Sequence, residues 1–144
     1  MKAVGSGRAE PLRVRRVEYR SDLVVLVVDG CVEISSAAVL GDAFARAMAD
    51  RACRVIVGDL TAVRFLSAAG LRVLVEAAAD ARARGIRLGL VASESITMRV
   101  LRMSGVAATI PVFTALSDGI RELAAGAGGP DPAGPGRARR GGTA

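Results

Sequence analysis

The sequence has no histidine, a single lysine and only 3% aromatic residues among its 144 positions. The lack of histidine argues against the usual zinc sites, a Cys–His nucleophile pair and a histidine general base. The only lysine is Lys2, and neither GxGxxG nor GxxxxGK(S/T) occurs, so the known phosphate-binding loops are missing. Asp59 follows a predicted strand but has no carboxylate partner close in the sequence. We therefore expect no enzyme activity, no cofactor and no metal.

Cysteine pairs and long hydrophobic runs are also lacking. Cys31 and Cys53 form no CxxC motif, and we expect free, partly buried thiols in a reducing compartment. The longest apolar run, Leu23 to Val28, is far shorter than the roughly 20 residues that span a bilayer. Met1 to Gly5 carries a charge but does not lead into the apolar segment of a signal peptide. These features predict a cytoplasmic protein without membrane insertion.

The net charge of +6 is concentrated at the two ends of the chain. Residues 1–20 carry +4 and residues 126–144 carry +2, whereas residues 21–125 are neutral. A specific nucleic-acid reader needs basic residues clustered on a folded face, so we predict solvated basic termini. Weak contact of these ends with RNA, DNA or anionic lipid is the alternative. We expect a flexible lead-in at 1–11, one domain at 12–125 and a disordered Gly/Pro/Arg-rich tail at 126–144.

Valine-rich runs alternate with segments whose apolar residues recur at helical spacing, which predicts an α/β fold. The run at 23–28 is typical of a strand buried on both faces, closed by a turn at Asp29-Gly30 before a short strand at 31–34. The sheet should be mixed but mostly parallel, with about four to five strands and about four helices. Further strands are expected at 12–19, 54–60, 87–92 and 110–113, and helices at 37–50, 68–84, 95–104 and 115–124.

Helix starts and helix faces can also be predicted. Serines precede three of the helices, and serine is a favoured N-cap because its side-chain oxygen accepts from a free backbone N–H. Helical spacing places Val39, Val75 and Ile96 on faces that point toward the core. The N-cap candidates are Ser35 or Ser36, then Ser67, then Ser93 or Ser95.

The most informative segment runs from Val57 to Leu71 and reads Val-Gly-Asp-Leu-Thr-Ala-Val-Arg-Phe-Leu-Ser-Ala-Ala-Gly-Leu. It resembles the STAS domain family, the fold of bacterial anti-sigma factor antagonists. In that family a strand ending in Asp-Leu is followed by an apolar pair and then by Asp-Ser-Ser-Gly-Leu at the start of a helix.

Two further landmarks agree with this resemblance, which covers about residues 12–124. The stretch from Val28 to Glu33 is similar to the family's Gly-x-Leu-Asp turn, with Glu33 in place of the aspartate. Leu101 and Gly105 match the family's Leu-x-x-x-Gly helix end. The resemblance implies the STAS fold.

The family regulates binding through a serine in this loop, which the anti-sigma kinase phosphorylates. The added phosphate breaks the complex through repulsion and desolvation. Counted back from Gly70, the phosphoserine position is Ala68, which has no hydroxyl, and the second serine is replaced by Ala69. Ser67 stands in place of the family aspartate and is either the N-cap of the helix or a substitute phosphoacceptor. The resemblance thus implies an antagonist without the usual phosphoserine switch.

The resemblance also implies a partner and a contact surface. The partner would be an anti-sigma factor, a GHKL-type serine-protein kinase, and binding to it would release a sigma factor for transcription. A homodimer through the edge strand at 12–19 is a further prediction. The residues expected to touch the partner are Glu33 and Ser35, then Phe65, Leu66, Ser67, Ala68, Ala69 and Gly70, then Arg72, and more weakly Ser93 and Glu94.

Other functions of the same fold remain open at this point. A soluble STAS accessory subunit of a transporter or of a signalling scaffold is the main alternative. A nucleotide-binding or nucleotide-hydrolysing STAS protein is less favoured, because no phosphate loop is found.

Overall fold

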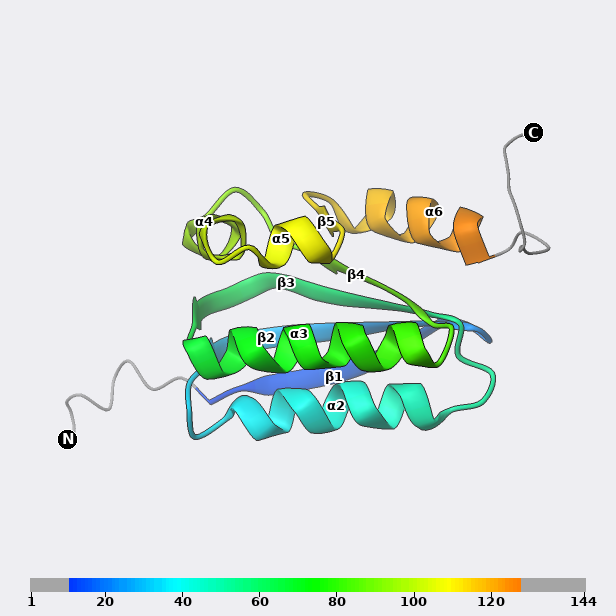
Figure 1. Ribbon diagram of the computed structural model, residues 1–144, viewed down its shortest axis with the longest axis horizontal. Coiled ribbons are helices and arrows are strands. Elements are labelled where there is room, and N and C mark those ends of the chain that lie inside the picture. Colours follow the sequence, from blue (N-terminus) through cyan, green and yellow to red (C-terminus); the bar gives the residue numbers. More distant parts are fainter. Residues whose placement is uncertain (1–10, 128–144) are drawn as a thin grey trace.

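The computed structural model describes residues 11–127 and contains a five-stranded sheet in the order β1-β2-β3-β4-β5 (Figure 1). β1 pairs with β2 in the antiparallel direction, and the other neighbouring strands are parallel. The mixed, mostly parallel sheet expected from the sequence is therefore confirmed. The strands are β1 (Arg13–Arg20), β2 (Leu23–Val32), β3 (Val55–Leu66), β4 (Arg87–Val91) and β5 (Val112–Phe113).

Helices cover both faces of the sheet. α2 (Ala37–Ala49) and α3 (Ala68–Ala83) lie side by side along β1 to β3, as Figure 1 shows. α4 (Ile96–Met103) packs against β3, and α6 (Leu116–Ala127) packs against β3, β4 and β5. The short α5 (Val106–Thr109) was not predicted, because four residues are too few to show a helical period.

The core consists of two hydrophobic clusters, one on each face of the sheet. Side chains alternate along a strand, so Val24 and Leu26 of β2 join the cluster under α2 and α3. Leu23 and Val25 join the cluster under α6. Each fully buried side chain of this size stabilises the fold by about 1.5–3 kcal/mol. The prediction that residues 23–28 form a strand buried on both faces is confirmed.

The predicted turn at Asp29-Gly30 is wrong, because β2 continues through it to Val32. Gly30 has φ +113°, and the pairing of β2 with β3 shifts register on both sides of Asp29 and Gly30. A Cβ at Gly30 would lie 2.5 Å from the carbonyl oxygen of Pro11. The glycine therefore allows a bulge and a close backbone approach within a strand that continues to Val32.

β3 is longer than predicted, since it continues past Leu60 to Leu66. The Asp59 carboxylate accepts hydrogen bonds from the backbone N–H and the hydroxyl of Thr61, at 3.1 and 2.8 Å. β4 pairs only with residues Val55 to Asp59 of β3, so the last part of β3 extends beyond it. α4 packs there instead, and the Thr97 hydroxyl donates to the carbonyl of Val63 at 2.9 Å.

Three helix-face predictions are wrong. Val39, Val75 and Ile96 are 47%, 47% and 72% exposed, although helical spacing placed them toward the core. These residues lie at the margins of the apolar stripes, where a helix side chain can face solvent instead of the sheet. The predicted helix start at Ser36 is confirmed in position, but its side chain makes no cap hydrogen bond.

One of the expected domain boundaries differs in the structure. α6 continues to Ala127, so residues 126 and 127 belong to a helix and not to the predicted disordered tail. The predictions for 1–10 and 128–144 lie outside the described residues. β1 forms an outer edge of the sheet, as the prediction of an edge strand requires.

Candidate functional site

The ends of the parallel strands β2 and β3 bring the predicted loop and the first turn together. Val32 pairs with Leu66 in the sheet register, and the backbone N–H of Ser67 donates to the Val32 carbonyl at 2.9 Å. Glu33 and Ser67 therefore both follow directly from neighbouring strand ends. Figure 1 shows this edge of the sheet beside the start of α3 and the start of α2.

Ser67 is the N-cap of α3, as predicted. Its backbone is extended, with φ −76° and ψ 170°, and its hydroxyl oxygen accepts from the backbone N–H of Gly70 at 3.2 Å. This bond satisfies one of the N–H groups that the first helical turn leaves unpaired. The side chain of Ser67 is consequently occupied in holding the helix start.

Gly70 is required by close packing at the same helix start. It is buried, and a Cβ there would lie 2.7 Å from both Leu66 Cδ1 and Val32 Cγ1. Only hydrogen fits at this distance, since side-chain carbons pack about 3.5–4 Å apart. The glycine thus lets the first turn of α3 lie directly on the strand ends, which fixes the position of Ala68 and Ala69.

The turn after β2 is held by Ser36. Its hydroxyl oxygen accepts from the backbone N–H of Glu33 at 2.9 Å, while the Glu33 carbonyl accepts from the N–H groups of Ser36 and Ala37. This small ring of bonds explains why Ser36 makes no side-chain cap of α2. It leaves Ile34 and Ser35 projecting, and Ile34 is 83% exposed.

The predicted contact residues divide into exposed and buried ones. Ala68, Arg72 and Ser35 are exposed, and Phe65 is 51% exposed despite its size. Leu66 and Gly70 are buried and support the loop from below. Ser67, Ala69 and Glu33 are half-buried. The structure therefore brings Glu33, Ser35, Phe65, Ser67, Ala68, Ala69 and Arg72 to one end of the domain as accessible groups.

Ser93 and Glu94 lie in the loop between β4, the strand next to β3, and α4. Both are exposed, and the Glu94 carboxylate forms a two-bond ion pair with Arg102, at 3.2 and 3.0 Å. Because α4 packs on the far part of β3, this loop borders the same end of the molecule as Phe65 (Figure 1).

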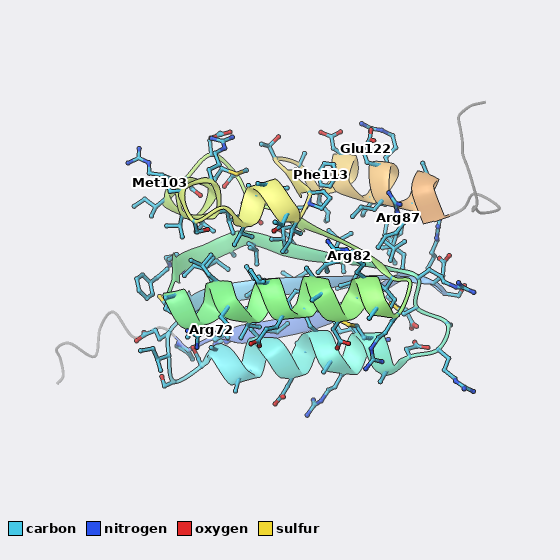
Figure 2. The ribbon with its side chains drawn as sticks, viewed as in Figure 1. Arg72, Arg82, Arg87, Met103, Phe113 and Glu122 are labelled. Atoms are coloured by element: carbon cyan, nitrogen blue, oxygen red, sulfur yellow. The ribbon has the colours of Figure 1, made fainter. Side chains whose placement is uncertain are left out.

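Three exposed apolar side chains at this end were missed or misplaced by the sequence reasoning. Ile34, Ile96 and Met103 are 83%, 72% and 80% exposed, and Figure 2 shows Met103 at the outer end of α4. The sequence offered one sign of this exposed apolar surface: Ile34 stands between the polar residues Glu33 and Ser35. Together with Phe65, these residues make the accessible surface more apolar than the predicted residues alone.

The accessible groups at this end are mainly small, apolar or singly charged side chains. Residues 11–127 contain no cluster of three or more metal-binding side chains, and none of their helices is long and apolar enough to cross a membrane. Burial raises the pKa of the Cys53 thiol, which keeps it protonated and unreactive at neutral pH. That thiol stands just before β3, at the opposite end of this strand from Ser67.

Comparison with known proteins agrees with this architecture. Residues 15–119 match the STAS domain family. The anti-sigma-F factor antagonist RsfB of Mycobacterium tuberculosis is 30% identical over 110 residues, which cover 76% of this chain and 88% of RsfB. Among solved structures, an anti-sigma factor antagonist from Mycobacterium paratuberculosis superposes with a TM-score of 0.73 at 24% identity, covering 79% of this chain and 95% of that one.

The likeness extends to more distant antagonists. The unphosphorylated form of the anti-sigma factor antagonist SpoIIAA superposes with a TM-score of 0.64 at 14% identity, covering 76% of this chain and 96% of that one. At this identity the likeness concerns the fold. From its family match and its similarity to RsfB, the chain belongs to the STAS domain family and stands with the anti-sigma factor antagonists.

Proposed function

We propose that the protein is an anti-sigma factor antagonist that binds a GHKL-type anti-sigma kinase and so releases a sigma factor, without the usual phosphoserine switch. The observation that carries the proposal is the position of Ala68. It is an exposed residue in the first turn of α3, at the place where the resemblance puts the phosphoserine.

The surface around Ala68 supports a docking role. Ala68 and Ala69 are small, so a partner backbone can approach the helix start closely. Phe65 and Ile34 add exposed apolar area, which becomes favourable when a partner covers it. Arg72, one turn along α3 from Ala68, supplies a positive charge at the border of this area.

The chemistry of the loop supports the loss of the switch. Ala68 has no hydroxyl to phosphorylate, and the Ser67 oxygen is half-buried and engaged with the Gly70 N–H. The cap bond occupies one of the two lone pairs of the Ser67 oxygen, and the half-buried position limits the approach of a phosphoryl donor to the other. Binding would then be governed by the amount of the antagonist or by another partner.

The experiment pairs the full chain with a GHKL-type anti-sigma kinase from the same organism and measures affinity by calorimetry. Ala68→Glu places a carboxylate in the proposed interface and should weaken binding at least about a hundredfold, as for a buried unpaired charge. The matched control is Ala79→Glu, because Ala79 is an exposed alanine farther along the same helix. Equal affinities for the two variants would place the interface elsewhere.

The absence of the switch is tested separately. The wild-type chain, incubated with the kinase and ATP, should gain no phosphate by intact-mass spectrometry. Ala68→Ser restores a hydroxyl at the first helical position and should become phosphorylated. Stoichiometric phosphate on Ser67 of the wild-type chain would contradict the proposal while leaving the interface assignment intact.

A further inference from the structure

The end of the domain opposite the Ser67 loop contains a cavity of about 200 Å³. α3 has 16 residues, so its last turn lies roughly 24 Å from its first at about 1.5 Å per residue. Since one water occupies about 30 Å³ in the liquid, the cavity has room for a small solute. The residues that line it are Ala78, Arg82, Ile86, Arg87, Leu88, Thr109, Ile110, Pro111 and Leu123.

Among the described residues of this lining, two arginines supply the only charges. Arg82 comes from the last turn of α3 and Arg87 is the first residue of β4, and Figure 2 shows both at this end of the molecule. No aspartate or glutamate from residues 11–127 lines the cavity. Two guanidinium groups beside apolar walls create a positive potential that the cavity itself does not neutralise.

The nearby carboxylates are directed elsewhere. Asp80 pairs with Arg84 at 3.1 Å, and Asp118 pairs with Arg121 at 2.7 Å. Glu122 is exposed, and Figure 2 shows it on the outer side of α6, away from Arg87. Within residues 11–127, Arg82 makes no ion pair and no side-chain hydrogen bond. Its donors are therefore available to a ligand.

Arg87 is held in place by the end of α6. Its Nε donates to the carbonyl oxygen of Leu123 at 3.1 Å. Its guanidinium also lies against Gly126, where an added Cβ would come within 2.2–2.6 Å of three guanidinium atoms. These two contacts restrict the arginine, so less conformational entropy is lost when its remaining N–H groups bind a ligand.

We propose that this cavity binds a small oxyanion, namely inorganic phosphate or a small phosphate monoester. Guanidinium groups donate paired hydrogen bonds that match phosphate oxygens, and the two arginines would bind from two elements. Ile86, Leu88 and Ile110 would contact the organic part of an ester. The part of the chain that the structure describes places no aromatic side chain in the lining for base stacking, which disfavours a nucleotide. This site is independent of the proposed partner surface.

The test is an NMR titration of the full chain with inorganic phosphate and, in parallel, with glycerol 3-phosphate. Chloride keeps the ionic strength constant, so that general screening produces no difference. Saturable shifts are expected for the backbone amides of residues 86–88 and 109–110. Tighter binding of the ester would assign a role to the apolar wall, whereas equal affinities would confine recognition to the phosphate group. Shifts that do not saturate, or that centre on residues 67–70, would overturn the proposal.

Variants make the test specific. Arg82→Gln should weaken the affinity at least about fivefold, because a charge-assisted pair of hydrogen bonds is lost. Arg87→Gln should do the same, with circular dichroism as a check that the fold is retained. The matched control is Arg46→Gln, since Arg46 is an exposed arginine in the last turn of α2. Equal weakening by Arg46→Gln, or none by Arg82→Gln, would refute the site.

Discussion

The backbone N–H of Ser67 donates to the carbonyl oxygen of Val32 at 2.9 Å, and this bond ties the start of α3 to the end of β2. It brings the turn after β2 and the first residue of α3 to the same edge of the sheet. The loop that ends β3 is thus fixed by a neighbouring strand as well as by its own cap.

Removing the cap hydroxyl should destabilise the protein. Ser67→Ala loses the acceptor of the Gly70 N–H and should lower the free energy of unfolding by about 1 kcal/mol. Urea denaturation monitored by circular dichroism measures this difference. Ser35→Ala is the control, because Ser35 is exposed and has no side-chain hydrogen bond among the described residues. If both variants were equally stable, the cap would contribute nothing.

Two glycine substitutions should have opposite signs. Gly70→Ala forces a Cβ to 2.7 Å from Leu66 and Val32, and should destabilise by about 1–3 kcal/mol. Gly41→Ala is the comparison, since a Cβ there meets Val73 at an ordinary 3.6 Å. Alanine favours the helix over glycine by about 0.5–1 kcal/mol, so Gly41→Ala should stabilise the protein. Thermal unfolding of both variants decides the matter, and a stabilising Gly70→Ala would contradict the packing described.

One buried hydrogen bond helps to hold α4 on β3, beside the buried side chains of Met98 and Leu101. Thr97 is 3% exposed, and its hydroxyl donates to the Val63 carbonyl at 2.9 Å. Thr97→Val keeps the shape but removes the donor, and should lower the free energy of unfolding by about 1–3 kcal/mol. Hydrogen exchange should also become faster in α4. Thr114→Val, at an exposed position, should change neither quantity, and the same loss in both variants would rule out this bond as the cause.

The pH dependence of stability should include a contribution from Cys53. Burial raises the pKa of its thiol above the ordinary value of 9.0, so the unfolded chain releases the proton more readily. The stabilisation is fully present below 9.0 and is lost as the pH rises through the folded-state pKa. Denaturation at several pH values, for the wild type and for Cys53→Ala, isolates the contribution of Cys53 to the pH dependence of stability. If the stability of Cys53→Ala declined at alkaline pH as steeply as that of the wild type, Cys53 would not be the source of the decline.

The local features of the site followed from the sequence. Ser67 as a cap depends on a few neighbouring residues, so a single segment contains enough information, whereas the close packing at Gly70 also involves Val32 of another strand. The buried strand at 23–28 was likewise evident, because a strand covered on both faces has no polar alternation. Gly105 with φ +88° ends α4 where the sequence placed a helix end.

The remaining features were decided by the tertiary structure. Asp29-Gly30 looks like a turn in isolation, but β2 runs on because its backbone groups pair with β3. Ile96 and Val75 have the spacing of core residues, yet exposure depends on what lies opposite the helix, and no element covers them. The surface around Ala68 and the cavity at Arg82 arise in the same way, from residues distant in the sequence that the sheet brings together. Sequence determined which short segments can form, and packing decided which of their side chains face solvent.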